Sequence, residues 1–178
     1  MAEIEKNELI RQFKKIAEFM EGTKFKTMVL EDMPGDMPVS MLIGLEGEIE
    51  EGHYIVCNLM PMEDDVAAYT NFLHMFYEIP YETAELNELD LLRAVNVMNS
   101  TMVAGSFICS RVSEEKARVQ LRLTLTADVE EEWNPSTVCE CACLMVEYAA
   151  VMEEIVSGLL AGMDLNTILE AEGLTEEG

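Results

Sequence analysis

Three cysteines within five residues, Cys139, Cys141 and Cys143, form the densest group of potentially reactive side chains in this chain. Thiolates bind zinc and copper(I) well and can be oxidised. The trio falls in a segment of helical periodicity, where residues two apart point about 200° from each other, so that only Cys139 and Cys143 share a face. Two ligands rarely suffice for a metal. The pattern therefore favours structural cysteines, with no metal and no cofactor, and leaves a metal- or redox-responsive role of the trio as the alternative.

Other side chains that could do chemistry are scattered. His53 and His74 are the two histidines of the chain, and each falls in an expected strand without a histidine partner at metal-binding spacing. The acidic runs at 46–51, 62–65 and 128–132 lack the ligand spacing of a calcium loop. No GxSxG or Cys–His signature is present, and no glycine-rich phosphate loop. We therefore expect a protein that is not an enzyme.

The charge of the chain narrows the range of partners. Its 35 acidic and 11 basic residues give a net charge of −24 at pH 7, which repels nucleic-acid phosphates and anionic lipid surfaces. A basic or amphipathic partner is favoured. We expect no signal peptide, because the start of the chain is charged and not apolar. No run of eighteen apolar residues occurs, and five cysteines are an odd number for a disulfide framework. We expect a cytoplasmic protein with no nucleic-acid or membrane partner.

The elements that position these side chains follow from periodicity. Apolar and polar residues alternate over 118–126, which places Val119, Leu121, Leu123 and Leu125 on one face of a strand. Asn134 is a good N-cap for a helix that begins near Pro135 and can end at Gly162. Its expected apolar stripe consists of Val138, Cys141, Met145, Tyr148, Met152, Ile155 and Leu159.

Earlier in the chain, a first helix is expected over 4–21, with Gly22 as its left-handed C-terminal residue. The other expected elements are strands over 24–30, 39–45, 53–60, the second half of 66–79, and 105–111, a helix from an Asn87 cap to about residue 102, and a short helix over 165–171 capped by Asp164. The stretch 64–69 fits either a helical turn or a strand.

This order, helix, four strands, helix, two strands and long helix, predicts the fold class. Strands joined by short turns pair antiparallel, so that we expect one antiparallel sheet with helices packed on one face, an α+β fold. The length of 178 residues predicts a single domain over 1–172, followed by an acidic tail over 173–178.

Four stretches resemble the YbjN family and its structural relatives, the type III secretion chaperone-like proteins. They are the aromatic strand LHMFYEIP at 73–80, the helix LDLLRAVNVMN at 89–99, the glycine-led strand GSFI at 105–108, and the last strand with the long helix that ends in SGLL at 157–160. The resemblance covers about 71–160. It implies a secretion chaperone-like fold and a protein that binds other proteins, commonly as a homodimer.

The functional expectation is a non-enzymatic protein-binding module that holds an apolar or amphipathic segment of a partner protein. Fourteen methionines, many of them in the N-terminal strands, suit an adaptable apolar surface. The residues expected to contact a partner are Met41, Ile43, Leu73, Met75 and Tyr77. A homodimer is the second expected use of such a surface.

Overall fold

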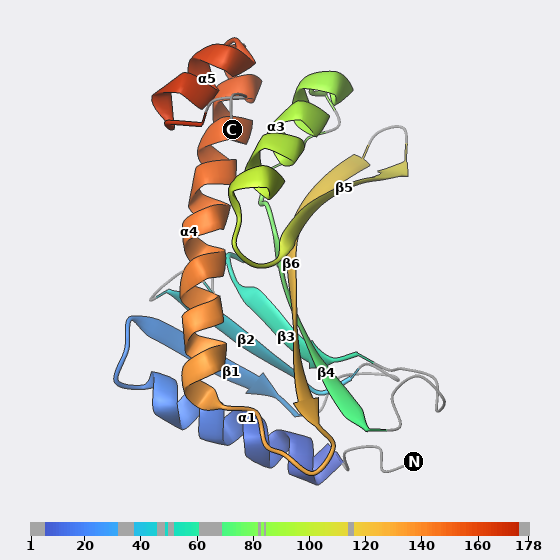
Figure 1. Ribbon diagram of the computed structural model, residues 1–178, viewed down its shortest axis with the longest axis vertical. Helices are drawn as coiled ribbons and strands as arrows, with labels where there is room; N and C mark the ends of the chain where they lie inside the picture. The colour runs from blue at the N-terminus through green and yellow to red at the C-terminus, as the bar shows by residue number, and fades with distance from the viewer. Residues whose placement is uncertain are drawn as a thin grey trace. The chain divides into compact units, whose positions relative to one another are not determined.

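The structure is a computed structural model that describes residues 6–31, 38–45, 49, 52–60, 69–81, 83, 85–113 and 116–174 (Figure 1). The elements, in chain order, are α1 (Lys6–Met20), β1 (Phe25–Leu30), β2 (Ser40–Leu45), β3 (Ile55–Leu59), β4 (Thr70–Glu78), α3 (Glu88–Thr101), β5 (Ser106–Ser113), β6 (Lys116–Asp128), α4 (Pro135–Leu160) and α5 (Leu165–Ala171). The predicted order of elements is confirmed. All of the stretch 64–69 except Tyr69 lies outside the described residues.

The strands form one antiparallel sheet in the order β1-β2-β3-β4-β6-β5, which confirms the predicted α+β class. Hairpins join β1 to β2, β2 to β3, β3 to β4 and β5 to β6, and their registers are antiparallel throughout. The chain that follows β4 forms α3 and β5 before β6 returns to pair beside β4.

Two compact units make up the chain, and each consists of two segments. The first unit is Met1–Phe76 with Leu123–Cys143, and the second is Tyr77–Arg122 with Leu144–Gly178. Residues of β4, β6 and α4 therefore belong to both units. The single domain over 1–172 stays a prediction.

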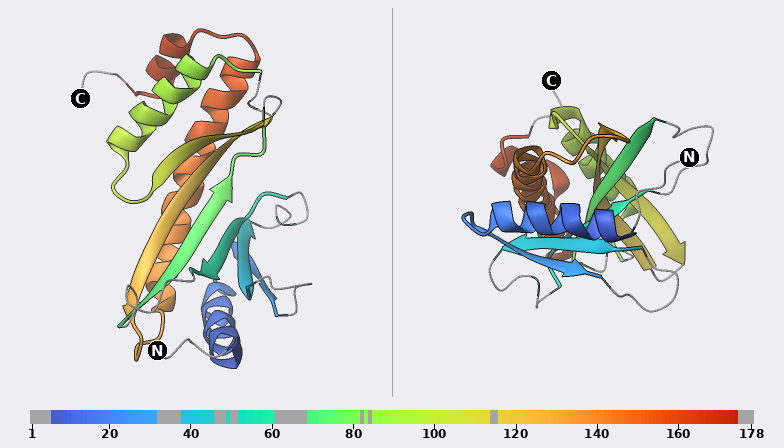
Figure 2. Two further views of the ribbon diagram at one scale, coloured as in Figure 1. Left: turned by 90° about the vertical axis from the view of Figure 1, so that its right-hand side faces the viewer. Right: turned by 90° about the horizontal axis from the view of Figure 1, so that it is seen from below.

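The core of the first unit lies between α1 and one face of its strands. Phe13, Ile16 and Met20 recur on one side of α1 at helical spacing and are fully buried. Figure 2 shows α1 lying along β1 and β2. The strand side chains buried on this face are Phe25, Met41, Ile43, Ile55, Cys57, Leu73 and Met75. They occupy alternate positions of each strand, as a half-buried sheet requires.

The core of the second unit is built by the later helices and strands. Val119 and Leu121 of β6 are buried, as their alternation predicts. The side chain of Asn99, near the end of α3, donates to the carbonyl of Phe107 at 3.1 Å and accepts from its N–H at 2.7 Å. This two-way hydrogen bond attaches α3 to β5. Ile168 of α5 packs directly over Gly158 of α4, where a Cβ would come within 2.8 Å of its Cδ1 atom.

The helix ends follow the sequence with one exception. The side chains of Asn87, Asn134 and Asp164 each accept a backbone N–H of the first helical turn, as an N-cap does. Gly162 has a φ of 79°, the left-handed geometry predicted for it. The same prediction for Gly22 is wrong, because the described residues with positive φ do not include it. There Thr23 ends α1 instead: its N–H and its hydroxyl both donate to the carbonyl of Met20.

Candidate protein-binding face

The strands of the first unit have a second face, opposite to the one that packs against α1. Cross-strand pairing places Met28 beside Leu42, Leu42 beside Val56, and Val56 beside Phe76, so that one apolar row crosses β1 to β4. Leu30 belongs to the next row. We call this surface the outer face. Met28 is 47% exposed, and Leu30, Val56 and Phe76 are half-buried. Leu42, in the middle of the row, is 9% exposed. The face is therefore apolar and partly open, most of all at Met28 on β1.

A groove runs over the middle of the outer face. Its volume is about 270 Å³, and it is lined by Leu30, Pro38, Ser40, Leu42, Tyr54, Val56 and Asn58. The polar pair Ser40 and Asn58 are cross-strand neighbours, and the Ser40 hydroxyl donates to the carbonyl of Pro38 at 3.1 Å. Small-molecule sites usually enclose about 300–1,000 Å³. This groove is smaller and lined mainly by apolar side chains, which suits one or two side chains of a partner.

Near the C-terminal end of β2, Ile49 packs over Gly44 on the outer face. A Cβ placed on Gly44 would meet the Cγ1 atom of Ile49 at 2.8 Å, so that only glycine at this position lets Ile49 pack against the strand. On β4, the rings of His74 and Phe76 stack with their centroids 5.6 Å apart. The Nδ1 atom of His74 lies 3.4 Å from the hydroxyl of Thr124. His74 is thus a packed histidine on the outer face.

The five residues predicted to contact a partner lie elsewhere. Met41, Ile43, Leu73 and Met75 are fully buried in the first unit, and Tyr77 is 7% exposed in the second. The alternation was predicted correctly, but these side chains are on the buried face of their strands. In this structure they are core residues, whereas Met28, on the outer face, is exposed.

The cysteine trio lies in α4, as predicted. Cys139 and Cys143 share a face, and a hydrogen bond joins their side chains. Burial, with the thiol of Cys143 alongside, raises the pKa of Cys139, and burial raises the pKa of Cys141. Reactive cysteines have lowered pKa values, so that these thiols are protonated and slow to react. Among the described residues, no group of three His, Cys, Asp or Glu side chains could hold a metal ion.

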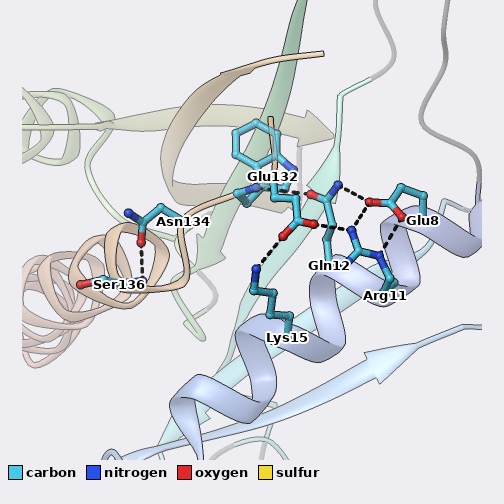
Figure 3. Close-up of polar contacts among 8 residues, drawn as sticks. Glu8, Arg11, Gln12, Lys15, Glu132, Asn134 and Ser136 are labelled. Carbon is cyan, nitrogen blue, oxygen red and sulfur yellow. Dashed lines mark hydrogen bonds and ion pairs between the residues drawn. The ribbon is translucent and has the colours of Figure 1, made fainter. Parts of the chain in front are cut away.

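A polar cluster ties α1 to the segment before α4 (Figure 3). Arg11 and Lys15 both bind the carboxylate of Glu132, and Arg11 also binds Glu8. The guanidinium of Arg11 lowers the pKa of Glu8 to about 2, and Lys15 together with Arg11 lowers the pKa of Glu132. Gln12 extends the cluster, since its amide donates to Glu8 at 2.9 Å and its carbonyl oxygen accepts the backbone N–H of Trp133. The cluster is a structural connection between distant segments.

Comparisons with known proteins assign no role to any residue. The chain matches no protein-family model and no curated protein. Its α+β fold is similar to the crystal structure of YbjN from E. coli over 96% of this chain and 94% of that chain, with a TM-score of 0.46 and 8% sequence identity. At that identity, no residue of YbjN has an assigned counterpart here. No helix in the described part of the chain is long and apolar enough to cross a membrane.

Proposed function

We propose that this protein is a non-enzymatic protein-binding module whose outer face holds an apolar or amphipathic segment of a partner protein. The observation that carries the proposal is the apolar row from Met28 to Phe76 beside the groove. Contiguous apolar surface of this kind is characteristic of interaction sites. A segment that lies across β1 to β3 would bury the exposed half of Met28 and place apolar side chains in the groove.

Burial of apolar surface favours binding by roughly 25 cal/mol of free energy for each Å² removed from water. The exposed part of the outer face supplies such area without any change in the core. The proposed module acts in the cytoplasm. A homodimer is the second proposed use of this apolar surface.

A binding experiment with paired variants tests the proposal. Three fluorescein-labelled peptides share one amphipathic apolar pattern and carry net charges of +4, 0 and −4, and fluorescence anisotropy measures the affinity of each. We expect at least one peptide to bind. Replacing Met28 and Leu30 by Gln should weaken its binding about tenfold or more, because two apolar contacts are lost.

The matched control replaces Leu89 and Leu92 by Gln. Both are exposed apolar residues, but they lie on α3 in the second unit. This variant should bind as the unaltered protein does. Binding by none of the peptides, or equal losses in the two variants, would contradict the proposal. Circular dichroism of both variants separates a lost contact from a lost fold.

A further inference from the structure

We infer that β1 is the strand through which two copies of this chain associate, edge to edge, in one antiparallel sheet. This inference rests on the homodimer proposed above and adds the strand, the register and the contacts of its interface. It follows from the hydrogen bonding at the two edges of the sheet, which are β1 and β5.

The β5 edge, in the second unit, already holds a side chain in the place of a strand. The amide of Asn99 accepts the backbone N–H of Phe107 at 2.7 Å and donates to its carbonyl oxygen at 3.1 Å, as a neighbouring strand would. The pairing of β5 is also irregular between Arg111 and Ser113. An edge that is covered and irregular resists the addition of another strand.

The β1 edge, in the first unit, has neither feature. Its pairing with β2 keeps one register over the whole strand, and the strand contains no proline. Edge strands are usually protected against pairing by proline, a bulge, a covering segment or charge. Of these, the described residues of β1 supply only the charge of Lys26. β1 is therefore the edge at which a further strand can be added.

The hydrogen-bond pattern of the sheet shows which backbone groups of β1 face outwards. Bonded and non-bonded pairs alternate along and across antiparallel strands, and the bond from the N–H of Met60 to the carbonyl of Phe72 sets the phase of this alternation. Followed through the registers to β1, the alternation directs the N–H and C=O groups of Thr27 and Val29 away from β2. Within the described part of the chain, these outward groups have no hydrogen-bond partner.

These two residues select one register for a pair of β1 strands. The outward N–H of Phe25 already binds the hydroxyl of Thr23 at 3.1 Å, so only Thr27 and Val29 have both groups free. In an antiparallel pair of β1 strands, Thr27 of each copy faces Val29 of the other, and each pair exchanges both of its N–H···O bonds. The two-fold axis then passes beside Met28, which faces Met28 of the second copy, so the interface is isologous.

The side chains of β1 suit a second copy in this register. Met28 is 47% exposed, and its contact with Met28 of the second copy buries part of that surface. Thr27 and Val29 are β-branched, and such residues form favourable cross-strand pairs. Lys26 lies opposite Leu30 of the second copy, where its methylene stem can pack. The two Lys26 residues are roughly 14 Å apart along the strands, beyond the screening length of about 8 Å at 0.15 M salt.

The charge of the strand also permits two acidic chains to meet there. At 0.15 M salt, charges more than about 8 Å from an interface contribute little. In the described sequence, the charged residues within β1 and directly beside it are Lys24, Lys26 and Glu31, and Glu31 is bound by Lys14 of α1 at 2.7 Å. Although the chain has a net charge of −24, β1 therefore brings no net negative charge to the interface.

Sedimentation velocity of the full chain tests the association, and we expect a monomer–dimer equilibrium between about 1 and 200 µM protein. Val29→Pro removes an outward N–H and leaves the bonds between β1 and β2 in place, because the backbone groups of Val29 point away from β2. This variant should raise the dissociation constant about tenfold or more. The matched control is Val29→Thr, which keeps the N–H and the branched side chain and should change the constant less than about threefold.

Disulfide formation in a glutathione buffer tests the register without a proline. Met28→Cys should give a disulfide between two copies, because facing residues of a non-hydrogen-bonded pair have Cα atoms about 4.5 Å apart. Lys26→Cys, on the same face of the same strand, should not, because its two copies are roughly 14 Å apart. Peptide mapping by mass spectrometry distinguishes the new disulfide from any bond of the five native cysteines.

The outcomes separate this inference from the proposed partner-binding face. A chain that stays monomeric at 200 µM, a dimer that Val29→Pro leaves unchanged, or equal cross-linking at positions 26 and 28 would each overturn β1 as the interface. If circular dichroism shows that Val29→Pro does not fold, the two cysteine variants decide the question. Peptide binding without a dimer would leave the outer face standing, whereas a β1-linked dimer that binds none of the three peptides would overturn the outer face alone.

Discussion

The hydroxyl of Tyr77 donates a 2.6 Å hydrogen bond to Oε1 of Glu153, which attaches the end of β4 to the middle of α4 within the second unit. Tyr77 is buried apart from 7% of its surface, so its ring packs in the core while its hydroxyl reaches the carboxylate of Glu153. A tyrosine held in this way is a structural residue, although its position in an aromatic strand suggested a contact with a partner.

Replacing Tyr77 by Phe should therefore lower the free energy of unfolding and leave peptide binding unchanged. The variant loses a hydrogen bond to a charged group, which contributes about 1.5–3 kcal/mol. Urea denaturation measures the loss, and the Tyr81→Phe variant, at an exposed position, is the control. If the Tyr77→Phe variant kept its stability but bound peptide more weakly, Tyr77 would be a contact residue and not a structural one.

Leu123 and Thr124 provide a second comparison, on the two faces of β6. Leu123 is 6% exposed and Thr124 is exposed, although they are neighbours in sequence. Leu123→Ala should lower the free energy of unfolding by about 2–5 kcal/mol, because it leaves a cavity in the core. Thr124→Ala should cost far less. Similar losses in urea melts of the two variants would mean that the alternation does not mark the buried face.

The alternation of β4 shows what the sequence can and cannot predict. It separates Leu73 and Met75 from Phe72 and Phe76 correctly, because side chains alternate along any strand. Both sets are apolar, however, and no local pattern predicts which of them the rest of the first unit will bury. That choice depends on the packing of distant segments, and the predicted contact residues fell on the covered face for this reason. The outer face carried a weaker signal, namely an apolar Met28 between the half-buried Thr27 and Val29.

Glycines and charged residues also show that local sequence patterns do not predict contacts between distant segments. Gly22 and Gly162 both follow a predicted helix, yet of the two only Gly162 has the left-handed geometry, since Thr23 already binds the carbonyl of Met20 at the end of α1. The ion pair between Arg11 and Glu132 joins residues 121 apart, a separation at which no local pattern operates. Periodicity and capping therefore predicted the elements and their order, whereas the contacts between elements came from the structure.

The two glycines give a third prediction. Gly162→Ala should lower the free energy of unfolding by about 1–2 kcal/mol, because a Cβ is strained at a φ of 79°. Gly22→Ala should leave stability unchanged or raise it by up to about 1 kcal/mol, since φ is not positive there and no atom lies within 4 Å of the added Cβ. Thermal melts of the two variants measure both changes. Equal destabilisation of the two variants would contradict the left-handed geometry of Gly162 and its absence at Gly22.

The carboxylate of Glu8 predicts a dependence of stability on pH. Its pKa falls from the ordinary value of 4.5 to about 2 on folding, because Arg11 binds the charged form. A lowered pKa means that the contribution to stability is fully present above pH 4.5 and is lost as the pH falls towards 2. The effect is small, since the group is exposed.

The experiment compares urea midpoints of the unaltered protein and the Glu8→Gln variant between pH 7 and pH 2. The variant should be less stable at pH 7, and the difference should vanish as the pH approaches 2. Glu18→Gln, at an exposed position on the same helix, is the control. A difference that persists unchanged at pH 2 would show that Glu8 acts through its shape and not through its charge.

The cysteines give the last prediction, that the purified protein carries no stoichiometric metal. Cys139 and Cys143 share a face but bind each other, and Cys141 lies on a different side of α4. Burial raises the pKa of Cys139 and of Cys141, so the thiolates that zinc or copper(I) would bind are scarce at pH 7. Elemental analysis should therefore find well under one metal ion per chain. One zinc or copper per chain that is lost in Cys139→Ser or Cys143→Ser, but retained in Cys141→Ser, would contradict this and establish the metal-responsive alternative.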